Sequence, residues 1–115
     1  MKSLLDGLMV LLAAAFGLFL SPPSKAAEGW TSYGTVQEVY PNSTGAFYVR
    51  INVSTSPAST CLAGWFSHTG TGNGANRVFA ALLAAQATGK PVRVYVLGTC
   101  DQWAYADISA ASVAN

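Results

Sequence analysis

Residues 73–100 constrain the fold most, because this stretch contains one helix pattern and one strand pattern in succession. Its first half places apolar side chains at the offsets that share one stripe of a helix, with alanines filling the other faces. The side chains of this stripe are Val78, Phe79, Leu82 and Leu83. A short amphipathic helix packed on a sheet is therefore predicted.

The two ends of this helix and the strand after it have their own signals. Asn73 or Asn76 can cap the first turn by accepting a backbone N–H, and Gly89 can end the helix in the left-handed conformation. Lys90-Pro91 then prevents the helix from continuing. In Val92–Leu97 every second residue is valine, which predicts a strand with one fully buried face.

Four other segments have strand patterns, and together they predict the fold class. These segments are Thr31–Tyr40, Ala46–Val53, Thr60–Ser67 and Ala104–Val113. Gly34 and Gly64 lie inside two of them, where a small barrel needs its strands to bend. Five strands with one helix after the third is the order of the OB-fold, a five-stranded Greek-key barrel. We predict a mainly β, OB-fold-like barrel; the alternative is an α+β sheet with one helix packed across it.

The N-terminal residues have the composition of an export signal. Met1-Lys2 is positively charged, Leu8–Leu20 is a continuous apolar run, and Ser24-Lys25-Ala26 is the small-x-small pattern that signal peptidase cleaves. We predict a signal peptide over residues 1–26, one domain over residues 27–115, and a secreted or periplasmic location. The alternatives are an uncleaved membrane anchor, which normally requires about 20 apolar residues, and a buried helix.

The charges of residues 27–115 balance. The basic residues are Arg50, Arg77, Lys90 and Arg93, and the acidic residues are Glu28, Glu38, Asp101 and Asp107. Proteins that bind nucleic acid carry a basic stripe, and anionic membranes attract basic clusters. We therefore expect neither nucleic acid nor an anionic membrane surface as a partner.

Cys61 and Cys100 are the two cysteines of the chain. In an oxidising compartment they predict one disulfide, which would support a domain barely large enough for a self-sufficient core. Two free thiols or a metal site are the alternatives. A metal is disfavoured because His68 is the only histidine and neither cysteine has a partner at ligand spacing. We expect no metal and no cofactor.

Few residues are candidates for catalysis. Ser67 and His68 are adjacent on a strand pattern, so their side chains point to opposite faces, and His68 is interpreted as a solvated loop residue. Asp101 and Asp107 would serve glycoside hydrolysis only if they lay about 5 to 10 Å apart across a groove. The glycine-rich segment 67–74 lacks the ending of a phosphate loop. We expect a protein that is not an enzyme; a hydrolase using His68 is a third hypothesis.

The stretch VFAALLAAQATGKPVRVYVLGTC, together with the leader, Gly29-Trp30-Thr31 and the FYVRI strand, resembles the subtilase cytotoxin B-subunit-like group of small exported bacterial proteins. In the toxins of that group, an OB-fold B subunit assembles into a ring, binds sialylated glycans and delivers a separate catalytic subunit. Other similar sequences are free-standing exported proteins. The resemblance implies an OB-fold, a homo-oligomer and a glycan or protein partner, but it carries over no individual pocket residue.

Aromatic residues are the strongest indication of a binding site. They are Trp30, Tyr33, Tyr40, Tyr48, Trp65, Trp103 and Tyr105. Flat rings pack on the C–H faces of sugars while polar neighbours bind the hydroxyls. An OB-fold places such a site on its second and third strands and on the loops joining strands 1–2 and 4–5. The candidate ligand-binding residues are therefore Asn42, Thr44, Tyr48, Arg50, Trp65, Asp101, Gln102 and Trp103.

Two readings of these residues stay open at this point. The tryptophans could cap the core, and the tyrosines could lie along strands because strands favour them. Arg50, beside Tyr48, could meet a sialic acid carboxylate or only water. The leading hypothesis is an exported, non-enzymatic binding module that engages a glycan or protein partner. The alternative is a free-standing secreted or periplasmic structural or accessory protein without a small-molecule ligand.

Overall fold

The structure is a computed structural model that describes residues 27–115; the predicted signal peptide lies outside the described residues. Within this range the chain forms six strands and one helix. The strands are β1 (Gly29–Trp30), β2 (Val36–Pro41), β3 (Phe47–Ile51), β4 (Trp65–His68), β5 (Val92–Cys100) and β6 (Ala106–Val113). The helix, α2 (Ala75–Thr88), lies between β4 and β5. The predicted mainly β class and the position of the helix are confirmed.

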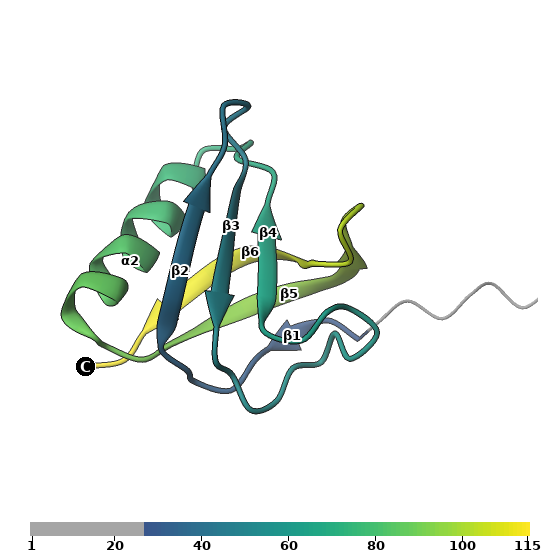
Figure 1. Cartoon of the computed structure of the whole chain (residues 1–115), viewed down its shortest axis with the longest axis horizontal. Coiled ribbons are helices and arrows are strands. Elements are labelled where there is room, and N and C mark those ends of the chain that lie inside the picture. Colours follow the sequence, from purple (N-terminus) through teal and green to yellow (C-terminus); the bar gives the residue numbers. More distant parts are fainter. Residues whose placement is uncertain (1–26) are drawn as a thin grey trace, which may run out of the picture.

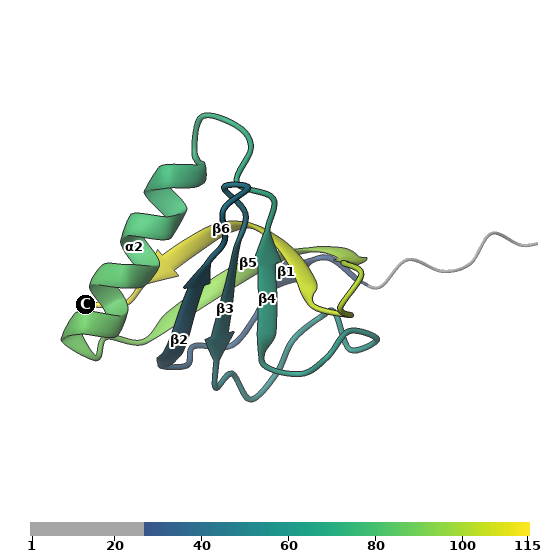
Figure 2. The same ribbon diagram turned by 45° about the horizontal axis from the view of Figure 1, so that its top comes forward.

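All six strands belong to one sheet, in the order β1-β5-β6-β4-β3-β2. Neighbouring strands are antiparallel except β4 and β6, which run parallel. Figures 1 and 2 show β2, β3 and β4 side by side in one layer, with β5 and β6 crossing behind them. The hydrophobic core lies between these two parts of the sheet.

The core follows the alternation that the sequence predicts. Val49 and Ile51 of β3 and the three valines of β5 are completely buried, whereas Arg50 is exposed. Residues two apart on a strand share a face, so each strand contributes one row of side chains to the interior. At about 25 cal/mol per Å² of apolar surface, such rows supply most of the favourable free energy of folding.

Helix α2 closes one side of this core, beside β2 and β6 (Figure 1). Leu82 and Ala85 are buried on the side of the helix that faces the core. Leu83 lies at the edge of this buried stripe and is 41% exposed. The predicted asparagine cap is wrong: the residue before the helix is Gly74, and no side chain caps it. The predicted end is confirmed, since Gly89 is left-handed and its N–H donates to the carbonyl of Ala85.

The bounds of the predicted first strand, residues 31–40, are wrong: only residues 36–40 of it belong to a strand, β2, and a divide separates β2 from β1, which lies before the predicted segment. The divide lies at Gly34, where a side chain would collide with the backbone of Asn52 and where the backbone bridges to Val92. The chain turns at this point to leave β5 and join β3. The sheet therefore has six strands where the sequence predicted five.

The predicted third strand, residues 60–67, is shorter than expected and begins at Trp65. Cys61 lies in a turn, where its N–H donates to the carbonyl of Ala58 and the N–H of Leu62 donates to the carbonyl of Ala104. The predicted strand over Val92–Leu97 is longer than expected. Strand β5 continues to Cys100, which pairs with Ala106, so the turn occupies residues 101–104.

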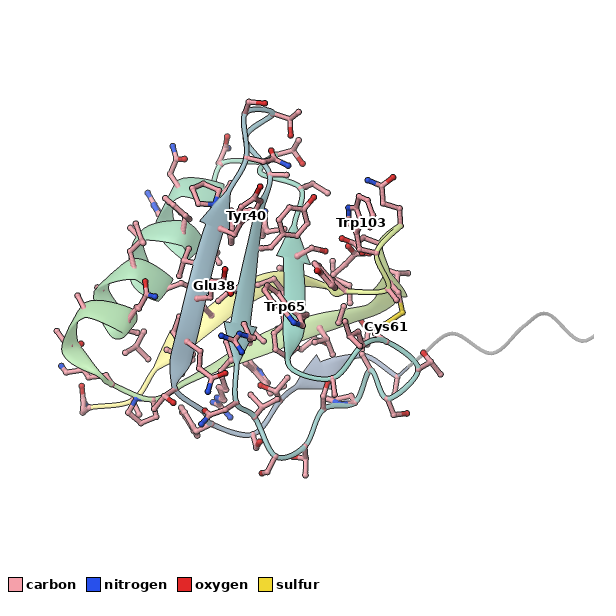
Figure 3. The ribbon with its side chains drawn as sticks, in the orientation of Figure 1. Glu38, Tyr40, Cys61, Trp65 and Trp103 are labelled. Atoms are coloured by element: carbon pink, nitrogen blue, oxygen red, sulfur yellow. A yellow bond between two sulfur atoms is a disulfide. The ribbon has the colours of Figure 1, made fainter. Side chains whose placement is uncertain are left out.

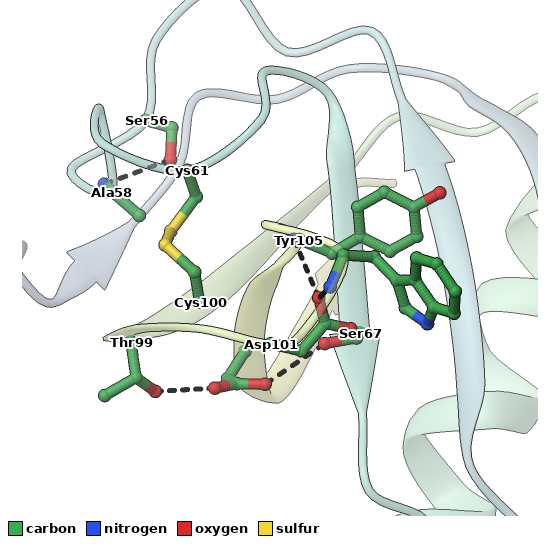
Figure 4. Close-up of a disulfide and its surroundings, with 10 residues drawn as sticks. Ser56, Ala58, Cys61, Ser67, Thr99, Cys100, Asp101 and Tyr105 are labelled. Atoms are coloured by element: carbon green, nitrogen blue, oxygen red, sulfur yellow. Dashed lines mark hydrogen bonds between the residues drawn. A yellow bond between two sulfur atoms is a disulfide. The ribbon is translucent and has the colours of Figure 1, made fainter.

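The predicted disulfide between Cys61 and Cys100 is present, with a sulfur–sulfur distance of 1.97 Å. It ties the turn before β4 to the end of β5 (Figure 4). Because these segments are far apart in the chain, the bond restrains the unfolded state more than a local cross-link would.

Across residues 27–115, no helix has the length and apolar character needed to cross a membrane.

Candidate functional site

An open groove of about 490 Å³ lies on the face of β2, β3 and β4 that points away from the core. Five of its seven lining residues are aromatic. They are Tyr40, Tyr48, Trp65, Trp103 and Tyr105, and the remaining two are Glu38 and Asn42. Figure 3 shows Glu38, Tyr40 and Trp65 over the strands and Trp103 on the segment at their side. Strands β2, β3 and β4 fix Glu38, Tyr40, Tyr48 and Trp65 on a rigid surface, as a preformed binding site requires.

A bulge in β2 decides which of its side chains reach the groove. Val36 is buried opposite Ile51, and regular alternation would send Glu38 to the same buried face. The register instead shifts between Val36 and Glu38, so that Glu38 pairs with Arg50 on the outer face. The extra residue reverses the phase of the strand and places Glu38 and Tyr40 in the groove.

The rings form a continuous series of contacts across the strands. Tyr40 and Tyr48 have centroids 5.8 Å apart, and Tyr48 meets Tyr105 edge to face at 5.6 Å. Trp65 stacks on Tyr105 at 5.1 Å. Aromatic pairs at these separations stabilise one another by about 0.5–1.5 kcal/mol beyond their buried area. The wall of the groove is therefore held in place before any ligand arrives.

Trp103 reaches the groove from the turn between β5 and β6. The carboxylate of Asp101 accepts hydrogen bonds from the N–H groups of Trp103 and Tyr105, at 2.8 and 2.9 Å (Figure 4). Ala104 completes the turn with a positive φ of 65°. The Trp103 side chain is 60% exposed, although tryptophan is usually well buried. Large exposed apolar side chains are typical of binding surfaces.

Charged groups border the ring series at β2 and β3. Arg50 Nε lies 3.7 Å from a carboxylate oxygen of Glu38, and both side chains are about half exposed. The Arg50 guanidinium also lies over the ring of Trp65, 5.7 Å from its centroid. Arg50 therefore borders the groove and does not line it.

A polar network lies next to the rings. The Ser67 hydroxyl donates to one carboxylate oxygen of Asp107 at 3.1 Å, and the Thr99 hydroxyl donates to the other at 2.6 Å. Ser67 is opposite Tyr48 on β3 and opposite Asp107 on β6. This network links β4, β5 and β6 beneath the aromatic wall.

The structure brings half of the predicted site residues into the groove. Those that line it are Asn42, Tyr48, Trp65 and Trp103. Of the others, Arg50 borders the groove and Asp101 orders the turn that carries Trp103. Thr44 donates its hydroxyl to Asn42 at 2.5 Å and so holds that side chain. Gln102 is exposed in the turn, and the structure gives it no contact with the groove.

Sequence reasoning missed three lining residues, Glu38, Tyr40 and Tyr105. The two tyrosines belonged to the aromatic set, but the bulge and the parallel pairing of β4 with β6 are not visible in the sequence pattern.

The interpretation of His68 as a solvated loop residue is also wrong. His68 ends β4, is 9% exposed, and stacks on Phe47 at 4.9 Å.

Burial lowers the pKa of His68 below its usual value of 6.5, and its Nδ1 accepts the N–H of Gly70 at 2.9 Å. This histidine lies on the core side of β4, whereas Ser67 faces the groove layer. The two residues therefore form no dyad. In the part of the chain that the structure describes, no three histidine, cysteine or acidic side chains gather closely enough to hold a metal ion.

Comparison of the chain with models of known protein families and with curated protein sequences finds no match.

Proposed function

We propose that this protein is an exported, non-enzymatic module that binds a saccharide in the aromatic groove. The observation that carries the proposal is the gathering of five rings, one carboxylate and one amide side chain on a single open surface. Sugars present apolar C–H faces and hydroxyl edges, which suit rings and polar side chains respectively. The length of the groove across three strands fits a short oligosaccharide better than a single small ring.

Several features of the described residues support binding without catalysis. Both oxygens of Asp107 accept hydrogen bonds from hydroxyls, and Asp101 is engaged with the backbone of its own turn. Glu38 is the one carboxylate that lines the groove. Glycoside hydrolysis uses two carboxyl groups facing each other across the scissile bond.

The OB-fold is the second part of the proposal. The two ends of the sheet, β1 and β2, are consecutive in the chain, and Gly34 between them bridges to β5. This arrangement supports a barrel in which residues 29–41 act as one bent first strand. The groove then occupies the face that OB-folds use for oligosaccharides and oligonucleotides.

Export is the third part. A cross-link between Cys61 and Cys100 is expected to persist in an oxidising compartment, and such bonds are rare where thiols are kept reduced. The predicted signal peptide over residues 1–26 directs this export. Together they favour a periplasmic or extracellular protein that meets saccharides outside the cytoplasm.

A glycan array tests the binding proposal directly. The protein is exported with its own leader, purified in the oxidised form, and applied beside the Trp103→Ala variant. We expect hits among oligosaccharides that weaken at least about tenfold, or 1.4 kcal/mol, in the variant. An array without any hit would contradict the proposal and favour a structural or accessory protein without a small-molecule ligand.

A further inference from the structure

We infer that the groove selects saccharides that carry a free amino group and rejects those that carry a carboxylate. This inference rests on the proposed saccharide-binding function and specifies its ligand. It differs from what the resemblance to sialic-acid-binding toxins implies, because a sialylated glycan is anionic. The reasons are the distribution of charge, the position of Glu38 and the chemistry of the rings.

Acidic groups concentrate around the groove although residues 27–115 are neutral as a whole. Glu38 lines the groove, Asp101 orders the turn that carries Trp103, and Asp107 lies in the network beside Ser67. Arg50 is the one basic residue at this surface among the described residues. The local balance is therefore negative, which raises the local concentration of cations and repels anions.

The remaining basic residues lie elsewhere on the molecule. Arg77 is on helix α2, and Lys90 follows the end of that helix. Arg93 lies over the rings of Trp30 and Tyr33, 4.7 and 5.2 Å from their centroids, at the β1 and β5 part of the sheet. None of them lines the groove.

Arg50 does not provide a strong anion site, because its charge is already directed toward two neighbours. Its Nε faces Glu38, and its guanidinium plane faces Trp65. A ligand carboxylate that reached Arg50 would have to approach the carboxylate of Glu38 as well. Like charges at such short range oppose binding.

Glu38 is well placed to receive a cationic group. Its distance of 3.7 Å from Arg50 Nε is longer than a hydrogen bond, so its oxygens keep acceptor capacity for a ligand. Tyrosine and tryptophan rings line the same groove as this carboxylate, and aromatic rings attract cations through their quadrupoles. An ammonium group on a sugar ring would satisfy both kinds of neighbour, and the C–H face of the same ring would pack on the aromatic wall.

Three matched trisaccharides test the inference by isothermal titration calorimetry on the oxidised protein. They are the glucosamine trimer, which carries amino groups, the N-acetylglucosamine trimer, which is neutral, and sialyllactose, which carries a carboxylate. We expect the glucosamine trimer to bind about fivefold more tightly than the neutral trimer, and sialyllactose to bind least. Added salt should reduce the preference for the amine, because exposed ion pairs are screened.

The Glu38→Gln variant identifies the source of the preference. We expect the ratio of amine to neutral affinity to fall close to one in Glu38→Gln. Glu28→Gln removes the same charge outside the groove and should leave the ratio unchanged. A ratio that survives Glu38→Gln, or sialyllactose binding as tightly as the glucosamine trimer, would overturn the inference. If the neutral trimer binds but the amine gives no advantage, only this inference fails, whereas absence of all saccharide binding defeats the proposed function itself.

Discussion

Trp65 of β4 stacks on Tyr105, the residue before β6, with ring planes only 13° apart and centroids 5.1 Å apart. The stack depends on the parallel pairing of β4 with β6, which aligns Phe66 with Ala106 and so places the preceding residues side by side. A wall built in this way loses little conformational entropy when a ligand binds. This wall of the groove therefore belongs to the sheet, whereas Trp103 is contributed by the turn between β5 and β6.

The two groove tryptophans should differ in what they contribute to stability. Trp65→Ala removes a partly buried ring with two packing partners, Tyr105 and Arg50, so we expect the free energy of unfolding to fall by about 2 kcal/mol. Trp103→Ala removes a ring that is 60% exposed, and we expect a change within about 0.5 kcal/mol. Urea unfolding of both variants measures these values, and equal losses would contradict the described packing.

The disulfide should provide a large share of the stability of this small domain. Cys61 and Cys100 are separated by 39 positions, for which the chain-entropy relation gives about 4 kcal/mol. We expect the double variant Cys61→Ala/Cys100→Ala to lose stability of this order in urea unfolding. The wild type in reducing agent should behave in the same way. A loss below about 1 kcal/mol in both experiments would show that the bond restrains the unfolded chain little.

The stability should depend on pH through His68. The unfolded chain binds a proton on this residue near the usual pKa of 6.5, whereas burial lowers the pKa in the folded state. The unfolded state then binds more protons between the two values, so the free energy of unfolding falls as the pH drops below about 6.5. Above that pH the contribution is fully present. The main physical cause is burial, which disfavours the charged imidazolium, and protonated Nδ1 can in addition no longer accept the N–H of Gly70.

The variant His68→Asn isolates this effect, because an amide oxygen can accept the same N–H but does not titrate. Urea unfolding at about pH 7.5 and about pH 5.5 should show a smaller difference for the variant than for the wild type. An equal difference in the two proteins would assign the pH dependence to other groups.

The loop after β4 should tolerate change at one glycine much better than at another. Gly70 has a φ of 77°, and an added Cβ would overlap the carbonyl of Gly45 in the turn between β2 and β3. Gly72 also has a positive φ, 92°, but open space around it. We expect Gly72→Ala to cost about 1 kcal/mol and Gly70→Ala about 3 kcal/mol or more.

The Gly70→Ala variant should also weaken saccharide binding, because the displaced turn follows Asn42, which lines the groove. Thermal unfolding and calorimetric titration of the two variants measure both effects. Equal destabilisation by the two substitutions would mean that the loop does not pack on the turn as described.

The sequence was most informative where local patterns decide the structure. The alternation in Phe47–Ile51 and Val92–Val96 predicted which side chains are buried, because the two faces of a strand meet different surroundings. Gly89 predicted the end of the helix through its tolerance of positive φ. The pairing of Cys61 with Cys100 followed from there being only two cysteines in the chain.

The rest depended on contacts between distant segments, which periodicity does not report. Glu38 and Tyr40 reach the groove only because a bulge shifts the register of β2. Tyr105 reaches it because β6 pairs in parallel with β4. His68 is buried because β4 begins later than predicted and carries it into the core beside Phe47. Four of the seven residues that line the groove were therefore predictable from residue types and turn positions, and three were not.

The most direct test of the proposed saccharide binding in the groove uses the indole N–H signals of the three tryptophans. Trp65 and Trp103 line the groove, whereas Trp30 lies against Arg93 and Tyr95 and serves as an internal control. A ¹⁵N-correlated spectrum of the oxidised protein is recorded during titration with the glucosamine and N-acetylglucosamine trimers. We predict that the Trp65 and Trp103 signals shift in a saturable manner while the Trp30 signal stays in place. A shift confined to Trp30, or no saturable shift of any indole, would contradict saccharide binding in the groove.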